Sequence, residues 1–131
     1  MRDGRSSSAI YIASPEGDTG KSTIALGIVH RLAATFATVG VFRPITRGDG
    51  EPRDYILELL LDQATAELPY DECVGVTYQQ LHDDFDAALG EIVDRFHHVA
   101  DQCDAVLVVG SDYTEVAAPS ELSVNARIAA N

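Results

Sequence analysis

The sequence has 131 residues, of which 46% are hydrophobic, and this is enough for one domain with a buried core rather than a disordered chain. Nine basic residues against 21 acidic ones give a net charge of −12, which disfavours nucleic acid as a partner. No apolar run approaches roughly 18 residues, and the first residues lack the apolar core of a secretory signal. We therefore expect a cytoplasmic protein with no membrane partner.

The first half of the chain predicts a strand, a helix, a second strand and a second helix. Residues 9–13 read as a buried strand that ends at Ser14-Pro15. A short strand at 41–42 is expected to end at Pro44, because proline has no N–H to donate to a ladder. A helix through residues 54–64 is opened by Pro52 and Arg53. Between the two strands, residues 21–36 predict a helix with one apolar face, formed by Ile24, Ala25, Ile28, Leu32 and Phe36.

The second half predicts a long helix, a buried strand and a final helix, whereas residues 68–77 have no clear pattern. Asp83 or Asp84 can cap the long helix. Residues 105–109 (AVLVV) are typical of a parallel strand covered on both faces, and Gly110 ends it. The last helix is expected to start at Ser120 and to run to the last residue. The inward stripe predicted for the long helix is Phe85, Ala88, Leu89, Ile92, Phe96, Val99 and Cys103.

The alternation of three predicted strands with helices indicates a doubly wound α/β fold with a mostly parallel sheet. Three parallel strands leave the edges of the sheet bare, and the sequence stops on a helix. We therefore expect a C-terminally incomplete domain at residues 9–131, preceded by a flexible N-terminus at 1–8. Cys73 and Cys103 have no paired cysteine neighbours, so we expect two buried free thiols rather than a disulfide or a zinc site.

Residues 14–23 (SPEGDTGKST) join the first predicted strand to the first predicted helix, which is the context of a phosphate-binding loop. Backbone N–H groups from about residue 17 to 22 can converge on an oxyanion at the positive end of the helix. The lysine would add a charge for terminal phosphates, and a hydroxyl of Ser22 or Thr23 would serve Mg²⁺. The candidate phosphate- or nucleotide-binding residues here are Gly17, Thr19, Gly20, Lys21, Ser22 and Thr23.

The same loop departs from the usual pattern, so a plain strand-to-helix turn with an exposed lysine is the alternative. Pro15 stands where the pattern begins with glycine, and it fixes φ. Glu16 and Asp18 place two carboxylates beside the expected anion. At about 6 Å and an effective dielectric constant near 20, each repulsion costs roughly 3 kcal/mol. Anion binding then requires those side chains to point away or a metal to lie between.

Other candidate site residues follow the second and third predicted strands. A nucleotidase needs an acid near the end of a neighbouring strand to hold its metal, but Val109 ends the strand at 105–109. Asp112 and Glu115 follow it, and Ser22 and Asp112 are the candidate metal ligands; acids in such loops are more often solvated or capping. Arg43 would bind an anion or only neutralise nearby acids. We interpret His30, His82, His97 and His98 as surface or packing residues, because their spacing does not suit a metal.

Five separated blocks of the sequence carry a resemblance to a known family. In sequence order they are IYIASPEGDTGKSTIALG, VGVFRPI, CVGVTY, CDAVLVVGSDYT and PSELSVNARIAAN. Together they resemble the N-terminal P-loop-like domain of the long form of bacterial phosphate acetyltransferase, over residues 9–131. The first block alone is similar to the broader dethiobiotin-synthetase-like group. The resemblance implies a P-loop NTPase-like, three-layer α/β/α architecture.

In that family, acetyl transfer between coenzyme A and phosphate takes place in a separate C-terminal domain. The resemblance therefore implies that this segment is noncatalytic, with a role in regulation and in homo-oligomer assembly, and that its partner is its own catalytic domain. Coenzyme A would bind only in that absent domain, whereas Mg-nucleotide or phosphate are the candidate ligands of the loop.

The alternative is an ATP-dependent, carboxylate-activating ligase of the dethiobiotin synthetase type. Gly20, Lys21 and Ser22 match the phosphate loop of that group. Arg43 takes the place of a lysine in its KP motif, and Val109 takes the place of a strand-terminal glutamate in its metal site. These two changes remove groups that ATP-dependent catalysis uses, but they leave anion binding intact.

Overall fold

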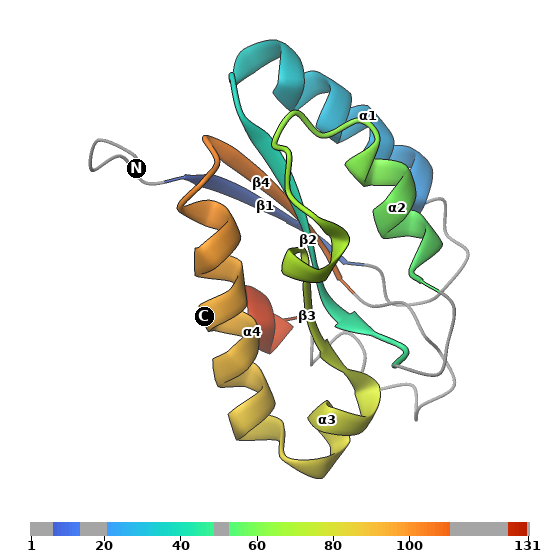
Figure 1. Cartoon of the computed structure of the whole chain (residues 1–131), viewed down its shortest axis with the longest axis vertical. Coiled ribbons are helices and arrows are strands. Elements are labelled where there is room, and N and C mark those ends of the chain that lie inside the picture. The colour runs from blue at the N-terminus through green and yellow to red at the C-terminus, as the bar shows by residue number, and fades with distance from the viewer. Residues whose placement is uncertain (1–6, 14–20, 49–52, 111–125, 131) are drawn as a thin grey trace.

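The computed structural model describes residues 7–13, 21–48, 53–110 and 126–130, which Figure 1 shows in colour. Strands alternate with helices along the chain, as the sequence predicts. No helix within these ranges is both long enough and apolar enough to cross a membrane. The elements are β1 (Ser8–Ile12), α1 (Lys21–Thr35), β2 (Val39–Thr46), α2 (Tyr55–Leu61), the 3₁₀ turn η1 (Tyr70–Glu72), β3 (Val74–Thr77), α3 (Tyr78–Asp83), α4 (Phe85–Ala100) and β4 (Ala105–Val109).

The described strands form one parallel sheet in the order β1-β4-β2-β3. Helices α1 and α2 lie on one face and α4 lies on the other, which gives three layers (Figure 1). This arrangement confirms the predicted α/β fold. Because every pairing is parallel, the carboxyl ends of the strands meet at one edge of the sheet, where doubly wound folds bind their ligands.

The core under α1 and α2 corrects the predicted face of the first helix. Ala25 and Leu32 are buried as expected, but Ile24 is 57% exposed and Val29 is buried. The apolar residues of α1 occupy neighbouring positions, at 24–26 and 28–29, so their spacing did not fix which of them turns inward. The strand and α2 residues of this core are Val39, Val41, Leu57, Leu60, Ala105, Leu107 and Val109, and Cys73, between η1 and β3, packs with them.

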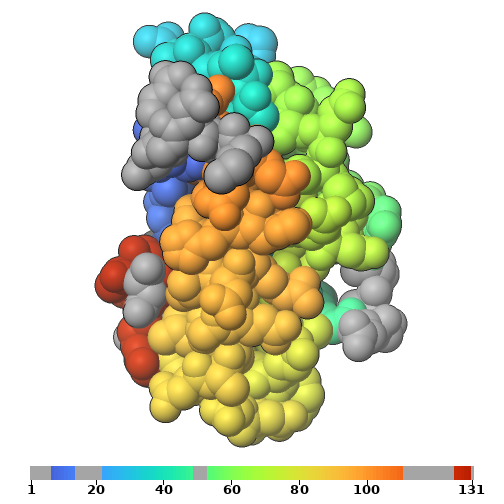
Figure 2. Space-filling view, turned by 60° about the vertical axis from the view of Figure 1, so that its left-hand side comes forward, coloured from blue at the N-terminus to red at the C-terminus, as the bar shows by residue number. Residues whose placement is uncertain are grey.

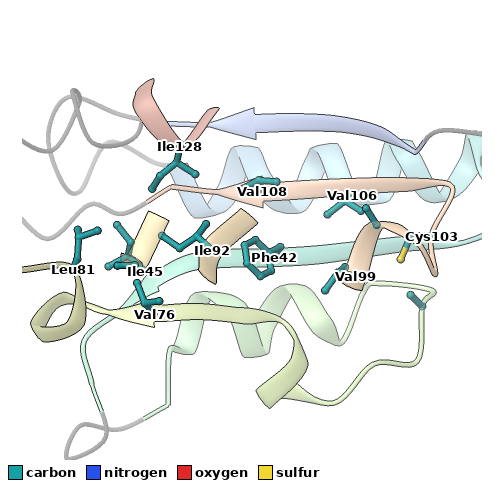
Figure 3. Close-up of a cluster of buried hydrophobic side chains, with 13 residues drawn as sticks. Phe42, Ile45, Val76, Leu81, Ile92, Val99, Cys103, Val106, Val108 and Ile128 are labelled. Carbon is teal, nitrogen blue, oxygen red and sulfur yellow. The ribbon is translucent and has the colours of Figure 1, made fainter. Parts of the chain in front are cut away.

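The core under α4 confirms the predicted stripe of the long helix (Figure 3). Ala88, Ile92 and Val99 are buried, and the other stripe residues of α4 are partly buried against the same cluster. Phe96 meets Phe42 of β2 edge to face, with ring centroids 5.9 Å apart. The carboxylate of Asp84 accepts a hydrogen bond from the N–H of Ala87 and caps α4, as one of the two predicted acids.

Two predicted strands differ from those in the structure. β1 is exposed at Ser8, Ala9 and Ile10 rather than buried, because it lies at an edge of the described sheet and pairs only with β4. β2 covers 39–46 instead of 41–42 and contains Pro44. Proline is tolerated there because β4 pairs with β2 only as far as Phe42.

The second half of the chain contains two elements that the sequence did not predict. β3 is a fourth strand, of only four residues, within residues 68–77, for which the sequence has no clear pattern. α3 begins directly after it with a capping box, in which Thr77 and Gln80 exchange side-chain and backbone hydrogen bonds. In the first half of the chain, α2 is predicted correctly but ends at Leu61 rather than near residue 64.

Residues 126–130 are helical and lie against α4, as the space-filling view shows (Figure 2). Ile128 is buried in the core under α4, and the guanidinium of Arg127 lies 4.4 Å from the ring centre of Phe85. These residues agree with the predicted final helix, whose expected start at Ser120 lies outside the described residues. Residues 1–6 also lie outside them, whereas the Ser7 hydroxyl donates a hydrogen bond to the Cys103 carbonyl at 2.6 Å.

Candidate functional site

The candidate site is the carboxyl edge of the sheet, where β1 and β4 end side by side and β2 continues past them to Thr46 (Figure 1). Lys21 is the first residue of α1, so the predicted lysine stands at the start of a 15-residue helix. Ser22 and Thr23 belong to its first turn; Ser22 is half-buried and Thr23 is exposed. Among the other predicted residues, Gly17, Thr19, Gly20, Asp112 and Glu115 lie outside the described residues, and their roles stay predictions.

Arg43 of β2 is the largest fully buried side chain in the described part of the chain. Its Nε donates to Oδ2 of Asp54 at 2.8 Å, and this ion pair is almost completely buried, with 1% and 4% of the two side chains exposed. Its Nη1 donates to the carbonyl of Gly110 at 2.8 Å. The carboxylate therefore neutralises the guanidinium, and the planar fork directs its donors to two separate elements.

Pro44, directly after Arg43, leaves β2 without a backbone N–H donor on the side that faces β4. The N–H of Arg43 donates to the Cys73 carbonyl, on the β3 side of β2. Backbone N–H groups alternate between the two sides of a strand, so the nitrogen of Pro44 faces β4 and has no hydrogen to donate. The register that pairs Phe42 with Val108 brings Gly110 to the level of Pro44. The guanidinium thus supplies a donor to β4 where the backbone ladder ends.

Asp54, the acidic partner of Arg43, is held in place by two further hydrogen bonds. It was not predicted as a site residue from the sequence. It is the N-cap of α2, and its Oδ1 accepts a hydrogen bond from the N–H of Leu57 at 3.0 Å. Its own N–H donates to the hydroxyl of Tyr70 at 2.7 Å. Burial raises the pKa of Tyr70 and outweighs the opposing effect of the hydrogen bond from the Asp54 N–H, so the phenol stays protonated. An aspartate directly before the apolar residues of a predicted helix is the N-cap signal that could have identified it.

Val109 occupies the strand end where the resemblance to the ligase group implies a metal-binding acid. Its side chain is completely buried in the core under α1 and α2, together with Leu107 and Ala25. A buried aliphatic side chain offers no oxygen ligand for Mg²⁺, which prefers carboxylates and water. This strand end therefore serves packing.

The histidines and cysteines of the described residues are not arranged as a metal site. No group of three or more His, Cys, Asp or Glu side chains within these residues could hold a metal ion. All four histidines are exposed on helices, as predicted, and Nε2 of His98 lies 2.7 Å from the Glu72 carboxylate. Cys73 and Cys103 are free and buried, which confirms their prediction.

The comparisons with known proteins agree with this architecture. Two curated proteins named phosphate acetyltransferase are similar to the chain. The protein from Synechocystis sp. is 30% identical over 129 residues, and the one from Nitratidesulfovibrio vulgaris is 28% identical over 131 residues. These matches cover 93% and 95% of this chain but only 18% and 19% of the relatives. Residues 8–131 match the AAA domain family, and the chain belongs to that family.

Proposed function

We propose that the chain is a noncatalytic portion of a phosphate acetyltransferase that serves regulation and assembly. The whole protein would interconvert acetyl-CoA and phosphate with acetyl phosphate and coenzyme A, and this chemistry would lie in a catalytic domain outside these residues. The relatives named phosphate acetyltransferase support the proposal, because the chain matches less than a fifth of their length. The partner of the chain would be that catalytic domain, within a homo-oligomer.

The observation that carries the proposal is what the side chains of Val109 and Arg43 contact. Val109 packs in the core, and Arg43 pairs with Asp54 and Gly110. These are the two positions at which the related ligases are expected to use a metal-binding acid and a lysine. Since both side chains are committed to internal contacts, they favour binding at this edge over ATP-dependent catalysis.

Anion binding remains the chemistry that this edge can offer. Lys21 begins α1, whose first-turn N–H groups carry a partial positive charge, and the hydroxyls of Ser22 and Thr23 lie in that turn. We therefore propose phosphate or a Mg-nucleotide as the ligand, with Ser22 on the metal where one is bound. A metabolite that carries such a group would be the regulatory signal.

Acetyl-transfer assays test the assignment of chemistry to another domain. The 131-residue chain is incubated with acetyl-CoA and phosphate, and release of the free thiol of coenzyme A is followed; we expect none. Thiol release above the buffer blank would overturn the proposal. The full-length enzyme is then compared with a form that lacks these residues. We expect acetyl transfer to persist, and the oligomeric state or the response to added nucleotide to change.

Calorimetry with Mg-ATP and with inorganic phosphate tests the anion site. We expect binding that Lys21→Ala weakens by about tenfold or more, because one phosphate contact is lost. The matched control is Arg31→Ala, which removes an exposed positive charge from the same helix, far from its first turn. Binding without release of ADP supports a regulatory site. Carboxylate-dependent ADP release would support the ligase instead.

A further inference from the structure

A continuous series of hydrogen bonds crosses the carboxyl edge from α2 to β1. Asp54 accepts from Arg43, and Arg43 donates to the carbonyl of Gly110. The N–H of Gly110 then donates to the carbonyl of Ile12 at 2.8 Å. Ile12 is the last residue of β1, the strand from which the chain continues toward Lys21. The buried ion pair is thus joined through one residue, Gly110, to the strand that leads into the candidate anion site.

We propose that Arg43 and Asp54 are positioning residues for anion binding at the carboxyl edge of the sheet, and that they act through Gly110 and Ile12. This inference rests on the proposed anion-binding function and deepens it. The guanidinium donates to the carbonyl of Gly110 and, at 3.5 Å, to the carbonyl of Val109. The peptide between Val109 and Gly110 carries the N–H that holds the end of β1, so the guanidinium restrains this peptide through its carbonyl. Neither side chain needs to touch the bound anion.

The geometry of the guanidinium favours positioning over simple filling of space. Nε and Nη1 lie in one rigid plane, so the bond to Asp54 fixes where the bond to Gly110 points. A lysine carries the same charge but one ammonium on a flexible stem, and it cannot hold both acceptors in this fixed relation. Asp54 is held in turn by its capping bond to Leu57, which ties the pair to α2.

Direct anion binding by Arg43, the alternative from the sequence, predicts the opposite response to a change at Asp54. If Arg43 contacts the anion, removing the competing carboxylate charge makes its guanidinium more available and tightens binding. If the pair positions Gly110, the same change loosens the strand end and weakens binding. Asp54→Asn is the suitable variant, because the amide oxygen can still accept the hydrogen bond from Leu57 and keep the helix cap.

The test measures the dissociation constants of Mg-ATP and inorganic phosphate by calorimetry on the folded 131-residue chain and its variants. We expect Asp54→Asn and Arg43→Lys each to weaken binding by about tenfold, a common size for coupling between sites. The matched control is Val99→Ala, a core variant at the other end of β2. Val99 lies there beside Gly40 and Cys103 (Figure 3). It destabilises the fold without touching the pair, and its affinity should stay unchanged.

Amide hydrogen exchange of the unliganded chain gives a second readout that does not depend on binding. We expect the amide of Gly110 to exchange faster in Asp54→Asn than in Val99→Ala, under conditions where both are folded. Tighter anion binding by Asp54→Asn would overturn the proposal in favour of direct contact. Equal loss of affinity in Val99→Ala, or unchanged exchange at Gly110, would also overturn it. If the unaltered chain binds neither probe, the anion-binding function fails; faster exchange at Gly110 would then still support the coupling of the pair to β1.

Discussion

The two ends of the sheet are completed in different ways. At the carboxyl end, a buried ion pair between Arg43 and Asp54 joins β2 to α2 and to the residue after β4. At the amino end, the backbone of Gly40 approaches Cys103 closely, and the Thr65 hydroxyl accepts a hydrogen bond from the N–H of Val39 at 2.7 Å. Close packing fixes the amino end, whereas directed charge fixes the end at which ligands of such sheets gather.

The difference shows where this fold tolerates a buried charge. A guanidinium out of water is costly unless its partner and its remaining donors are satisfied. Within the described residues, no buried side-chain nitrogen or oxygen lacks a hydrogen-bond partner, so the charge at the carboxyl end is compensated by its surroundings.

Removal of the acidic partner of the buried ion pair at the carboxyl end should have the largest effect on stability. Asp54→Ala leaves the Arg43 charge buried and unpaired, and we expect a loss of about 3–5 kcal/mol in the free energy of unfolding, measured by urea denaturation. The control Asp62→Ala removes an exposed acid from the other end of α2 and should change little.

The double variant Arg43→Met/Asp54→Leu sharpens this prediction. An apolar pair of similar volume leaves no buried charge, so we expect it to recover most of the stability that Asp54→Ala loses. A double variant no more stable than Asp54→Ala would show that the loss comes from packing or from the helix cap. In that case the contribution of the carboxyl end to stability would depend on side-chain volume, as that of the amino end does.

Breaking the amino end should have the next largest effect. A Cβ added at Gly40 would lie 2.6 Å from Sγ of Cys103 and 3.3 Å from Cγ1 of Val99. We expect Gly40→Ala to cost about 1–3 kcal/mol, as overpacking of a tight core does, again measured by urea denaturation. Adding Cys103→Ala should relieve most of this cost by removing the sulfur.

Gly90→Ala is the matched control for the glycine prediction. A Cβ at Gly90 meets nothing within 4 Å, on an exposed position of α4. It should stabilise the chain by about 0.5–1 kcal/mol, because alanine favours a helix over glycine. If both glycine variants change stability in the same direction, close approach is not what holds the amino end.

Removal of the Thr65 hydroxyl at the amino end of the sheet should have a smaller effect on stability. Thr65→Val keeps the shape of the side chain but leaves the buried N–H of Val39 without its acceptor, at a cost of about 1–2 kcal/mol in the free energy of unfolding. Thr65→Ser keeps the hydroxyl and should stay close to the unaltered chain. Equal losses in the two variants would show that the hydroxyl is not the cause, because Thr65→Ser keeps it.

The sequence predicted elements whose pattern and local cap agree. α4 and β4 were found because a helical stripe behind a capping aspartate, and a run of five apolar residues, each allow one interpretation. The inward face of α1 was wrong only at Ile24, with Val29 missed, because apolar residues at neighbouring positions allow two interpretations. β3 was missed because four residues after a 3₁₀ turn carry too little periodicity.

The candidate site was predictable only in part. Lys21 could be placed at the start of a helix from the strand, loop and helix pattern, and the structure puts it there. Arg43 was expected at the end of a short strand, whereas it lies within β2. Its partner Asp54 lies 11 residues further along the chain, and the pairing depends on how α2 packs on β2. Contacts set by packing between elements have no local pattern in the sequence.

The smallest effect on stability concerns a second ionisable group beside β2, which has no partner of opposite charge among the described residues. The Cys73 thiol lies in the core under α1 and α2, and burial raises its pKa from 9.0 to about 12, with smaller contributions from Cys103 and Glu72. Above its ordinary pKa the unfolded chain releases this proton, whereas the folded chain retains it. Stability is therefore fully present below pH 9 and falls as the pH rises toward 12.

Between about pH 8 and about pH 9.5 we expect the unaltered chain to lose on the order of 1 kcal/mol more than Cys73→Ala, in urea denaturation at each pH. Cys103→Ala is the control for removal of a buried thiol from the opposite face of the sheet. Parallel pH profiles of the unaltered chain and Cys73→Ala would mean that Cys73 ionises in the folded state as easily as in the unfolded one. A buried charge would then be tolerated beside β2 without a partner, and the ion pair of Arg43 would not be what makes the carboxyl end distinct.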